Sequence, residues 1–309
     1  MVPEAPVDLP LVVICGPTAV GKTAAAVLLA QHLRAEIIAA DSRTIYRFMD
    51  IGTAKPSAEQ RRAVPHHLLD IADPDEVVTL AHYRRLALEA IHGVQGRGRI
   101  PLLVGGTGLY IRAIVDGFAI PEVPPDRDLR TRLEEVEEAS PGALHARLSA
   151  VDPAAAARIH PRNVRRLIRA LEVYDRTGMP ISQWQQRGDS IGRTVQVGLT
   201  MDRAALYRRI DDRVDGQIAA GLVEEVRGLL ARGYQPDLPS MSGLGYKEIV
   251  AHLTGGVPLE DAVRRLKRNT RHFAKRQYTW FRADARIRWI NVDAMDAGAV
   301  ARAIAAVLE

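Results

Sequence analysis

The sequence lacks the features on which disulfide-bonded, membrane-spanning and low-complexity proteins depend. Its one cysteine, Cys15, can form neither an internal disulfide bond nor a cysteine-rich zinc site. No apolar run approaches the roughly 18 residues that a membrane-spanning helix needs, and there is no internal repeat or low-complexity tract. The first residues, MVPEAPVDLP, carry no basic cluster and no long apolar stretch, so we expect no secretory signal. These absences favour a cytoplasmic globular protein without a membrane partner, in which Cys15 is a small buried residue of a strand.

The composition sets only a mild expectation about partners. Hydrophobic residues make up 47% and charged residues 26% of the 309 residues, as in ordinary globular proteins. This length can bury a full core and still leave room for a second, smaller module. Lys and Arg outnumber Asp and Glu by 42 to 37, which gives a net charge of +5. So small an excess indicates an anionic partner only where the cations cluster, so their placement matters more than their sum.

Short apolar runs alternate with helical segments in the first third of the chain. Four of these runs predict buried strands: LVVIC (11–15), EIIAA (35–39), HLLDI (67–71) and IPLLV (100–104). Thr79 is placed to cap a helix over 80–95. The alternation predicts a doubly wound parallel sheet, in which ligands bind at the carboxyl ends of the strands. The residues expected at those ends are Gly16, Asp41 and Gly105–Gly106.

The pattern changes at PEVPPD (121–126), where three prolines in six residues indicate a linker. Helical segments dominate the stretch that follows, and Gly178 is placed to end one of them. TVQVGLTM (194–201) then alternates like a strand and is expected to rejoin the sheet. We therefore predict an α/β core over 1–120 and 194–309 with a helical insertion over 121–193. The last part of the core is expected to hold helices near 202–220, 221–232, 243–254 and 258–282, followed by a strand, RIRWINV (286–292).

The strongest single motif is GPTAVGKT (16–23), which matches G-x-x-x-x-G-K-[ST] in full. It follows a predicted strand and opens a predicted helix, so backbone N–H groups and the helix N-terminus can surround phosphate oxygens. The predicted phosphate cradle comprises Gly16, Pro17, Thr18, Ala19, Val20, Gly21, Lys22 and Thr23. Lys22 would reach the terminal phosphates, and the Thr23 hydroxyl would ligate Mg²⁺. A P-loop does not fix the reaction, however, and on this motif alone an ATP-dependent kinase is the default interpretation.

Seven stretches together resemble the tRNA dimethylallyltransferase (tRNA isopentenyltransferase) family. They run in the family's order along nearly the whole chain: GPTAVGKT (16–23), DSRTIYRFMDIGTAKP (41–56), PHHLLDI (65–71), LLVGGTGLYIRA (102–113), DPAAAARIHPRNVRRLIRALEV (152–173), GLGYKE (243–248) and TRHFAKRQYTWFR (270–282). The resemblance implies a P-loop NTPase-like core with a helical insertion that, together with the core, grips the tRNA anticodon arm. It also implies that the P-loop holds the diphosphate of dimethylallyl diphosphate with Mg²⁺, rather than ATP, and that the protein is a monomer.

The implied reaction moves the dimethylallyl group to the exocyclic N6 of adenosine 37, in tRNAs that read codons beginning with U. The products are N6-isopentenyladenosine and diphosphate. An adenine amine is a poor nucleophile that must lose a proton as the C–N bond forms, so a carboxylate that orients it and accepts the proton suits the chemistry. By resemblance Asp41 is that base, Thr107 lies near the reacting groups, and Arg213 stabilises the leaving diphosphate. Position alone leaves open that Asp41 binds a metal or caps a turn, that Thr107 caps a helix, and that Arg213 is a solvated surface residue.

Cations cluster in two stretches that suit a nucleic acid. Four arginines, at 162, 165, 166 and 169, fall at helical steps on one face, with no acid between 158 and 169. Ten Lys and Arg residues between 264 and 288 accompany a single acid, Asp284, and four interleaved aromatic residues that could stack on bases or belong to a core. With the resemblance, the residues expected to contact tRNA are Asp41, Ser42, Arg43, Thr44, Thr107, Arg130, Arg165, Arg166, Leu167, Ile168, Arg169, Ser242, Gly245, Tyr246, Lys247, Arg271, Lys275, Arg276 and Gln277.

The sequence departs from the family pattern at three places, and three other functions compete with the resemblance. Thr44 stands where many relatives have glutamine, Phe48 where many have glycine, and Ser242 where a larger polar residue is common. A nucleoside or small-molecule kinase would share the P-loop, but would not explain two distant basic clusters. A prenyltransferase acting on free adenine nucleotides would not need the basic insertion. A non-catalytic RNA-binding protein would need neither an intact GKT nor Asp41.

Overall fold

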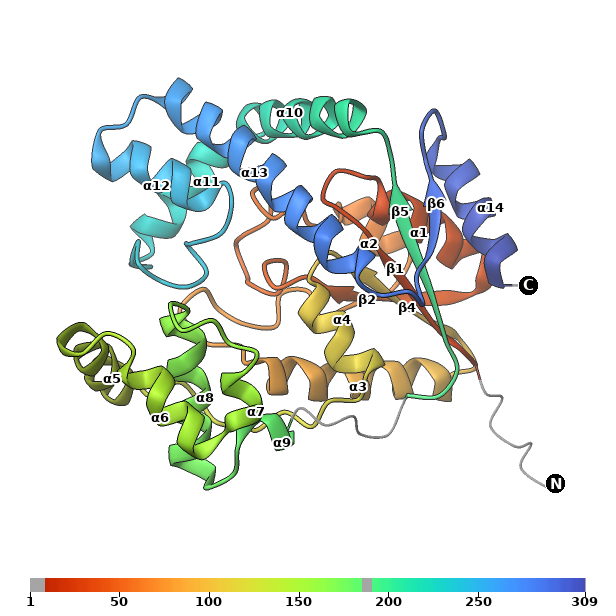
Figure 1. Cartoon of the computed structure of the whole chain (residues 1–309). Helices are drawn as coiled ribbons and strands as arrows, with labels where there is room; N and C mark the ends of the chain where they lie inside the picture. Colours follow the sequence, from red (N-terminus) through yellow and green to blue (C-terminus); the bar gives the residue numbers. More distant parts are fainter. Residues whose placement is uncertain (1–8, 185–190, 309) are drawn as a thin grey trace. The chain divides into compact units, whose positions relative to one another are not determined.

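Within the described residues, 9–184 and 191–308 of the computed structural model, six parallel strands form one sheet (Figure 1). The strands are β1 (Leu11–Cys15), β2 (Ala35–Ala40), β3 (His66–His67), β4 (Ile100–Gly105), β5 (Thr194–Thr200) and β6 (Arg288–Asn291). Their order across the sheet is β3-β2-β4-β1-β5-β6, and every neighbouring pair is parallel. The predicted α/β class is confirmed, and so is the return of TVQVGLTM to the sheet as β5. Most of MVPEAPVDLP and residues 185–190 of the predicted insertion lie outside the described residues.

One predicted strand is wrong over most of its length. The pattern predicts a strand over 67–71, but β3 consists of His66–His67 alone. Leu68 and Asp70 have positive φ angles of 65° and 55°, which take the backbone into the left-handed region and out of a ladder. The Asp70 carboxylate pairs with Lys55 and Arg61. Residues 68–71 therefore leave the sheet and contact the segment that holds these two cations.

The chain divides into two compact units, and the sheet belongs to the larger, which comprises 1–78, 85–111 and 191–309. Its helices are α1 (Lys22–Leu33), α2 (Ala58–Ala63), α10 (Arg203–Ala219), α11 (Leu222–Ala231), α12 (Tyr246–Gly255), α13 (Leu259–Arg282) and α14 (Ala297–Leu308). One core lies between the sheet, α1 and α14, and it includes Val27 and Ile304. A second core joins the loop around Met49 to α10–α13. In Figure 1, α11 and α12 lie at one end of this unit, away from α14, and α13 runs from them to the sheet.

The smaller unit comprises 79–84 and 112–190, and up to residue 184, where its description ends, its regular elements are helices. Its helices are α5 (Arg127–Ala139), α6 (Ala143–Val151), α7 (Pro153–Ala156), α8 (Val164–Thr177) and α9 (Ile181–Trp184), while α3 (Leu80–Gly96) and α4 (Gly108–Val115) continue across the division. Thr79 accepts the His82 N–H at 3.1 Å, and Gly178 ends α8 with φ of 68°, both as the sequence predicts. Leu167 and Ile168, which are expected at the tRNA, are 0% and 3% exposed, and their side chains lie in the core of this unit.

Two further observations concern Cys15 and the helices as a group. Cys15 is a free thiol, fully buried in β1, and burial raises its pKa to about 12. Among the helices of the described ranges, none combines the length and the apolar character that a bilayer span requires.

Candidate active site

A cavity of about 370 Å³ opens at the carboxyl ends of the strands, and all of its lining residues belong to the larger unit. It brings together the five residues expected to handle donor and acceptor: Lys22, Thr23, Asp41, Thr107 and Arg213. Further residues expected at the tRNA also line it: Ser42, Arg43, Thr44, Ser242, Tyr246, Lys247, Arg276 and Gln277. Residues that the sequence scatters over more than 250 positions therefore share one chamber. Gly245, Arg271 and Lys275 are not part of its lining.

The P-loop occupies the end of β1, where the backbone has little room. A side chain at Gly16, whose φ is +140°, would place its Cβ 2.6 Å from the carbonyl oxygen of Leu199 on β5. Gly21, with φ of +106°, begins α1. The Lys22 ammonium donates to the carbonyl oxygens of Gly16 and Pro17 at 3.0 and 2.7 Å. The lysine is thus folded over its own loop, where its charge faces the space that a phosphate would fill.

The electrostatics of the cavity favour an anion. Burial lowers the pKa of Lys22 to about 8, nearby Asp41 opposes this shift, and the positive charge of Arg213 adds to it. Burial likewise lowers the pKa of Arg213, against the attraction of Asp41. Two desolvated cations therefore face one carboxylate in a confined space. An incoming diphosphate would supply the missing negative charge.

Asp41 and Thr107 are neighbours because β2 and β4 end side by side. Ala40 pairs with Gly105 in the ladder, so tightly that a Cβ on Gly105 would lie 2.0 Å from the Ala40 carbonyl oxygen. The Thr107 hydroxyl accepts the Ser42 N–H at 3.0 Å, and Asp41 Oδ1 accepts the Arg43 N–H at 2.8 Å. Asp41 therefore caps the turn that follows β2 and also lines the cavity. The turn-capping role that its position leaves open is compatible with a role in the site.

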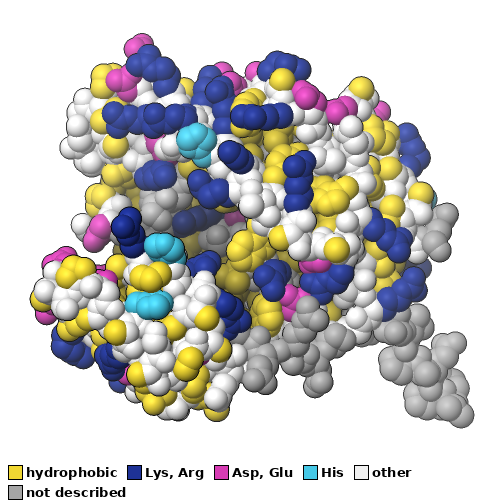
Figure 2. Space-filling view, viewed as in Figure 1, with side chains coloured by type: hydrophobic (Ala, Val, Ile, Leu, Met, Phe, Trp, Pro, Cys, Tyr) yellow, Lys and Arg dark blue, Asp and Glu magenta, His cyan; other side chains and the backbone are white. Residues whose placement is uncertain are grey.

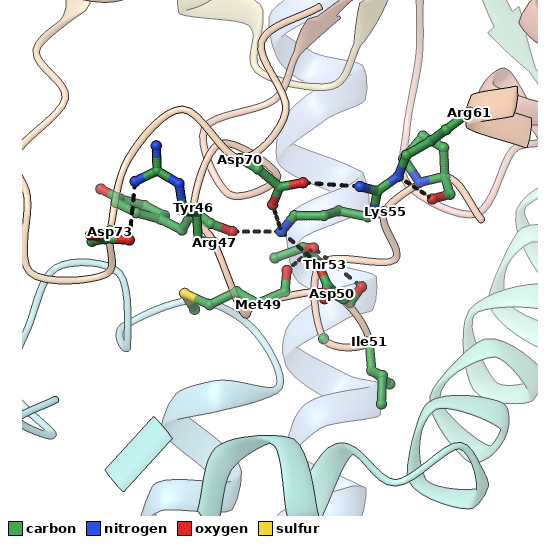
Figure 3. Close-up of polar contacts among 12 residues, drawn as sticks. Tyr46, Arg47, Met49, Asp50, Ile51, Thr53, Lys55, Arg61, Asp70 and Asp73 are labelled. Atoms are coloured by element: carbon green, nitrogen blue, oxygen red, sulfur yellow. Dashed lines mark hydrogen bonds and ion pairs between the residues drawn. The ribbon is translucent and has the colours of Figure 1, made fainter. Parts of the chain in front are cut away.

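The loop after Asp41 is held by a buried lysine (Figure 3). Lys55, 1% exposed, donates to the Tyr46 carbonyl at 2.5 Å, to Asp50 at 2.7 Å and to Asp70 at 2.5 Å. Arg61 pairs with the other oxygen of Asp70 at 2.9 Å. The Lys55 ammonium thus binds one backbone carbonyl and two carboxylates. These contacts fix the loop that brings Gly52, Thr53 and Ala54 to the cavity.

A carboxylate of α11, that of Glu225, also binds this loop. Glu225 accepts the N–H groups of Asp50, Ile51 and Gly52 at 2.7–3.1 Å and the Tyr246 hydroxyl at 2.6 Å. Gln217 of α10 donates to the Ile51 and Gly52 carbonyls at 2.7 and 3.0 Å. Sequence reasoning missed both Glu225 and Gln217, because a single polar residue on an ordinary helix gives no local signal. The Tyr246 hydroxyl, expected at the tRNA, is already committed to Glu225.

Two cavity-lining side chains have polar atoms that the rest of the described chain leaves without a hydrogen bond. They are Thr44 Oγ1 and His66 Nε2. The other ring nitrogen of His66 lies 2.8 Å from the Val64 carbonyl oxygen, and burial lowers the pKa of this histidine. Thr44 is 7% exposed. Buried polar atoms usually have partners, so these two are suited to contact a ligand.

Phe48, one of the departures from the family pattern, adopts a backbone conformation that favours glycine. Its φ is 64°, in the left-handed region that bulky residues rarely enter. The Arg232 guanidinium lies 4.2 Å from the centre of its ring, a cation–π contact that helps to hold this conformation.

The predicted tRNA-contacting cations differ in the partners that they have. Some are held by acids: Arg271 pairs with Asp211 on α10, and in the smaller unit Arg130 and Arg169 both bind Glu172, at 2.7 and 2.6 Å. Others are exposed and have no ion-pair partner within the described ranges, namely Arg165, Arg166, Lys275 and Arg276. Figure 2 shows Lys and Arg side chains gathered over the α12–α13 part of the larger unit.

The family can be read from comparisons with known proteins. A model of the family described as IPP transferase matches residues 44–284. A tRNA dimethylallyltransferase of Desulforudis audaxviator is 56% identical over 92% of both chains, and one of Pelotomaculum thermopropionicum is 52% identical over 96% of this chain and 95% of that one.

Solved structures agree. The tRNA isopentenylpyrophosphate transferase of Bacillus halodurans is 45% identical, with a TM-score of 0.72 over 97% of this chain and 96% of that one. A eukaryotic dimethylallyltransferase acting on tRNA has a TM-score of 0.81 at 29% identity, over 96% of this chain and 78% of that one. With a P-loop, Asp41 and Thr107 around one cavity, and with relatives along nearly its whole length, this chain belongs to the tRNA dimethylallyltransferase family of IPP transferases.

Proposed function

We propose that this protein transfers the dimethylallyl group of dimethylallyl diphosphate to the N6 atom of adenosine 37, in tRNAs that read codons beginning with U. The products are N6-isopentenyladenosine and diphosphate. The observation that carries the proposal is the shared cavity, in which a complete P-loop faces Asp41 and Thr107. A kinase would use the P-loop for ATP, but the family relationship and the carboxylate beside the loop favour transfer of the prenyl group.

The donor would bind with its diphosphate at the P-loop. Lys22 and Arg213 supply positive charge there, and both are desolvated enough for that charge to act strongly. As the bond between the allylic carbon and the diphosphate oxygen breaks, negative charge grows on the leaving diphosphate. Fixed cations at that point stabilise the transition state more than the ground state.

Mg²⁺ fits this site only together with the donor. No cluster of three or more His, Cys, Asp or Glu side chains in the described ranges could hold a metal, while the Thr23 hydroxyl lines the cavity. Mg²⁺ commonly takes few protein ligands and completes its shell with phosphate oxygens and water. Thr23 and the donor's diphosphate would hold the ion, which would neutralise charge on the leaving group.

The acceptor amine would lie against Asp41. Its carboxylate is fixed at the end of β2 and by the Arg43 N–H, which leaves Oδ2 available to the cavity. The N6 amine forms the new bond to the allylic carbon, diphosphate leaves with the electrons of the old bond, and the N6 proton passes to Asp41. Thr107, tied to Ser42, would help to orient the base beside the carboxylate.

The exposed cations would bind the anticodon arm. Arg165 and Arg166 on α8 and Lys275 and Arg276 on α13 present charge that no acid in the described chain neutralises. We also propose that the protein acts as a monomer in the cytoplasm.

The decisive experiment is mass spectrometry of tRNA nucleosides after incubation with dimethylallyl diphosphate and Mg²⁺. We expect N6-isopentenyladenosine at position 37 of tRNAs that read codons beginning with U. Parallel reactions with AMP, and with ATP in place of the prenyl donor, test the two other enzyme classes. Efficient prenylation of AMP without preference for tRNA, or phosphoryl transfer from ATP, would overturn the proposal.

A further inference from the structure

The side-chain amide of Gln277 bridges two loops of the cavity. Its Oε1 accepts the backbone N–H of Thr18, in the P-loop, at 2.8 Å. Its Nε2 donates to the backbone carbonyl of Gly106, beside Thr107, at 2.9 Å. Gln277 itself comes from α13, is 6% exposed and lines the cavity. One buried side chain therefore connects the loop expected to hold the donor to the loop that carries an acceptor-side hydroxyl.

The chemistry of this bridge requires an amide. The P-loop offers a donor and the Gly106 loop offers an acceptor, so the bridging group must accept on one side and donate on the other. A carboxylate would place a second acceptor against the Gly106 carbonyl, and an aliphatic side chain would leave both backbone groups unpaired. The fit also restricts Gly106, because a Cβ there would lie 2.2 Å from Gln277 Nε2.

The bridge changes the roles expected of Thr18 and of Gln277 itself. The Thr18 N–H is occupied by Gln277, so in this arrangement it is not one of the P-loop groups available to phosphate. The Gln277 amide has each of its ends in use within the protein, which does not suit the tRNA contact expected from the family resemblance. Its helix also places Phe273 and Arg276 on the cavity and is tied to α10, the helix of Arg213, through Arg271 and Asp211.

We propose that Gln277 is a positioning residue that holds the P-loop in register with the Gly106–Thr107 loop, and so sets the leaving diphosphate at a fixed distance from the acceptor side. This inference rests on the proposed donor site at the P-loop. Small displacements of reacting groups are costly to rate, so a spacer between the two loops acts on both donor affinity and turnover. It has no direct part in holding tRNA.

The test compares Gln277→Leu and Gln277→Glu with the unaltered protein and with Thr279→Ala. Leucine removes both hydrogen bonds at similar volume, while glutamate keeps the acceptor but brings a negative charge toward the diphosphate. Thr279 is the control because it is exposed on the same helix, two residues away, and bonds only within that helix. Circular dichroism and thermal unfolding establish that each variant is folded.

Three quantities are measured on the full-length protein: the affinity for inorganic diphosphate with Mg²⁺ by calorimetry, the affinity for tRNA by filter binding, and the single-turnover rate. Both Gln277 variants should bind diphosphate about tenfold more weakly and turn over at least about tenfold more slowly, with tRNA affinity within twofold to threefold of the unaltered protein. Glutamate should be the worse donor-site variant, and Thr279→Ala should match the unaltered protein.

The outcomes separate this inference from the function on which it rests. If folded Gln277→Leu binds diphosphate and turns over as the unaltered protein does, the positioning role is wrong while the proposed function stands. If its main defect is in tRNA affinity, Gln277 is a tRNA contact after all. If the unaltered protein binds neither inorganic diphosphate nor dimethylallyl diphosphate, the donor site itself is wrong.

Discussion

The two walls of the cavity are built in different ways. The donor wall, named for the proposed function, is the P-loop over residues 16–23, which runs from the end of β1 into the first residues of α1 and brings Thr18, Lys22 and Thr23 to the cavity. The acceptor wall consists of the loop 41–54 and the segment 242–247, and it is held by Glu225, Gln217 and Lys55, side chains from outside those segments. The donor wall depends mainly on backbone geometry, with the Gln277 amide as a side-chain tie at Thr18, while the acceptor wall depends on several polar side chains.

This difference predicts how each wall fails. A substitution of Lys22 in the donor wall removes a charge and leaves the rest of the cavity in place, because the backbone of the loop is fixed by the end of β1, the start of α1 and the Gln277 amide. A substitution among the side chains that hold the acceptor wall releases a whole loop. Changes in the two walls should therefore separate donor binding from tRNA use.

The largest effect is expected for Lys22→Ala, in the donor wall. Loss of one fixed positive group at a developing oxyanion typically lowers the rate by about 10²–10³-fold, and we expect single-turnover prenylation to fall by that amount. The affinity for tRNA, measured by filter binding, should stay within several-fold of the unaltered protein. The donor assignment fails if the protein binds ATP tightly and dimethylallyl diphosphate does not compete.

Next comes Asp41→Asn, which keeps the shape and much of the hydrogen bonding of the acceptor wall but removes the base. The single-turnover rate should fall by roughly 10² or more, with both affinities within several-fold of the unaltered protein, and Asp41→Ala should be at least as slow. A near-normal rate would assign the proton to another residue or to water. Loss of Mg²⁺-dependent donor binding would instead place Asp41 at the metal.

Glu225→Gln tests the support of the acceptor wall. An amide can keep some of the contacts of the carboxylate, but its NH₂ group would face the backbone N–H groups of the loop. Leaving a buried donor unpaired costs about 1–3 kcal/mol, and these donors are partly buried or exposed, so we expect kcat/KM for tRNA to fall by at most about tenfold while the KM for the donor is unchanged. The matched control is Glu224→Gln, since this exposed neighbour on α11 has Arg227 as its one ion-pair partner among the described residues. If the KM for the donor rises as much as kcat/KM for tRNA falls, the two walls are not independent.

Sequence reasoning located the donor wall well because its signals are local. A strand, a glycine-rich turn and a helix start are each visible within a few residues, and β1 and α1 lie where the pattern placed them. The same holds for the Thr79 cap and for Gly178. For the acceptor wall the family resemblance named residues that line the cavity, such as Asp41 and Ser242, but the contacts that hold them could not be read from the pattern.

The features that the sequence pattern could not supply have a common physical cause. HLLDI has the pattern of a strand, but Asp70 forms ion pairs with Lys55 and Arg61, and the backbone at Leu68 and Asp70 has positive φ angles. Leu167 and Ile168 lie beside exposed arginines in sequence, but the helical turn directs them into a core. In each case the outcome depends on partners distant in the chain, which no local pattern contains.

The exposed arginines of α8 test a region that belongs to neither wall. Replacing Arg165 and Arg166 together by Ala should weaken tRNA binding and reduce the slope of log affinity against log salt by roughly 1.8, for two lost duplex phosphate contacts. Stability should not change, because both side chains are exposed. Arg169→Ala is the contrasting variant. It removes the hydrogen bond that Arg169 donates to the buried carboxylate of Glu172, so it should lower the free energy of unfolding by about 2 kcal/mol. An equal loss of tRNA affinity in both variants would show that pairing with Glu172 does not keep Arg169 from the RNA.

The smallest effect concerns pH and again distinguishes the walls. In the donor-free protein the pKa of Lys22 is about 8, well below the usual 10.5, because of burial. Lys22 therefore loses its proton as the pH rises through about 8, and the donor then meets a neutral amine unless binding restores the proton. Between about pH 7 and about pH 9, affinity for dimethylallyl diphosphate, measured by calorimetry without tRNA, should fall several-fold, by at most tenfold for each pH unit above the pKa. Fold stability should change in the opposite direction. The unfolded chain holds the Lys22 proton up to about pH 10.5, so between about pH 8 and 10.5 it binds more protons than the folded chain, and Lys22 contributes stability that grows with pH.

Lys22→Arg keeps its charge across this pH range and should give a flat profile of donor affinity against pH even if its affinity is lower. If the decline persists in Lys22→Arg, another group is responsible for it, and if affinity for tRNA falls in parallel, the titrating group is shared by both walls.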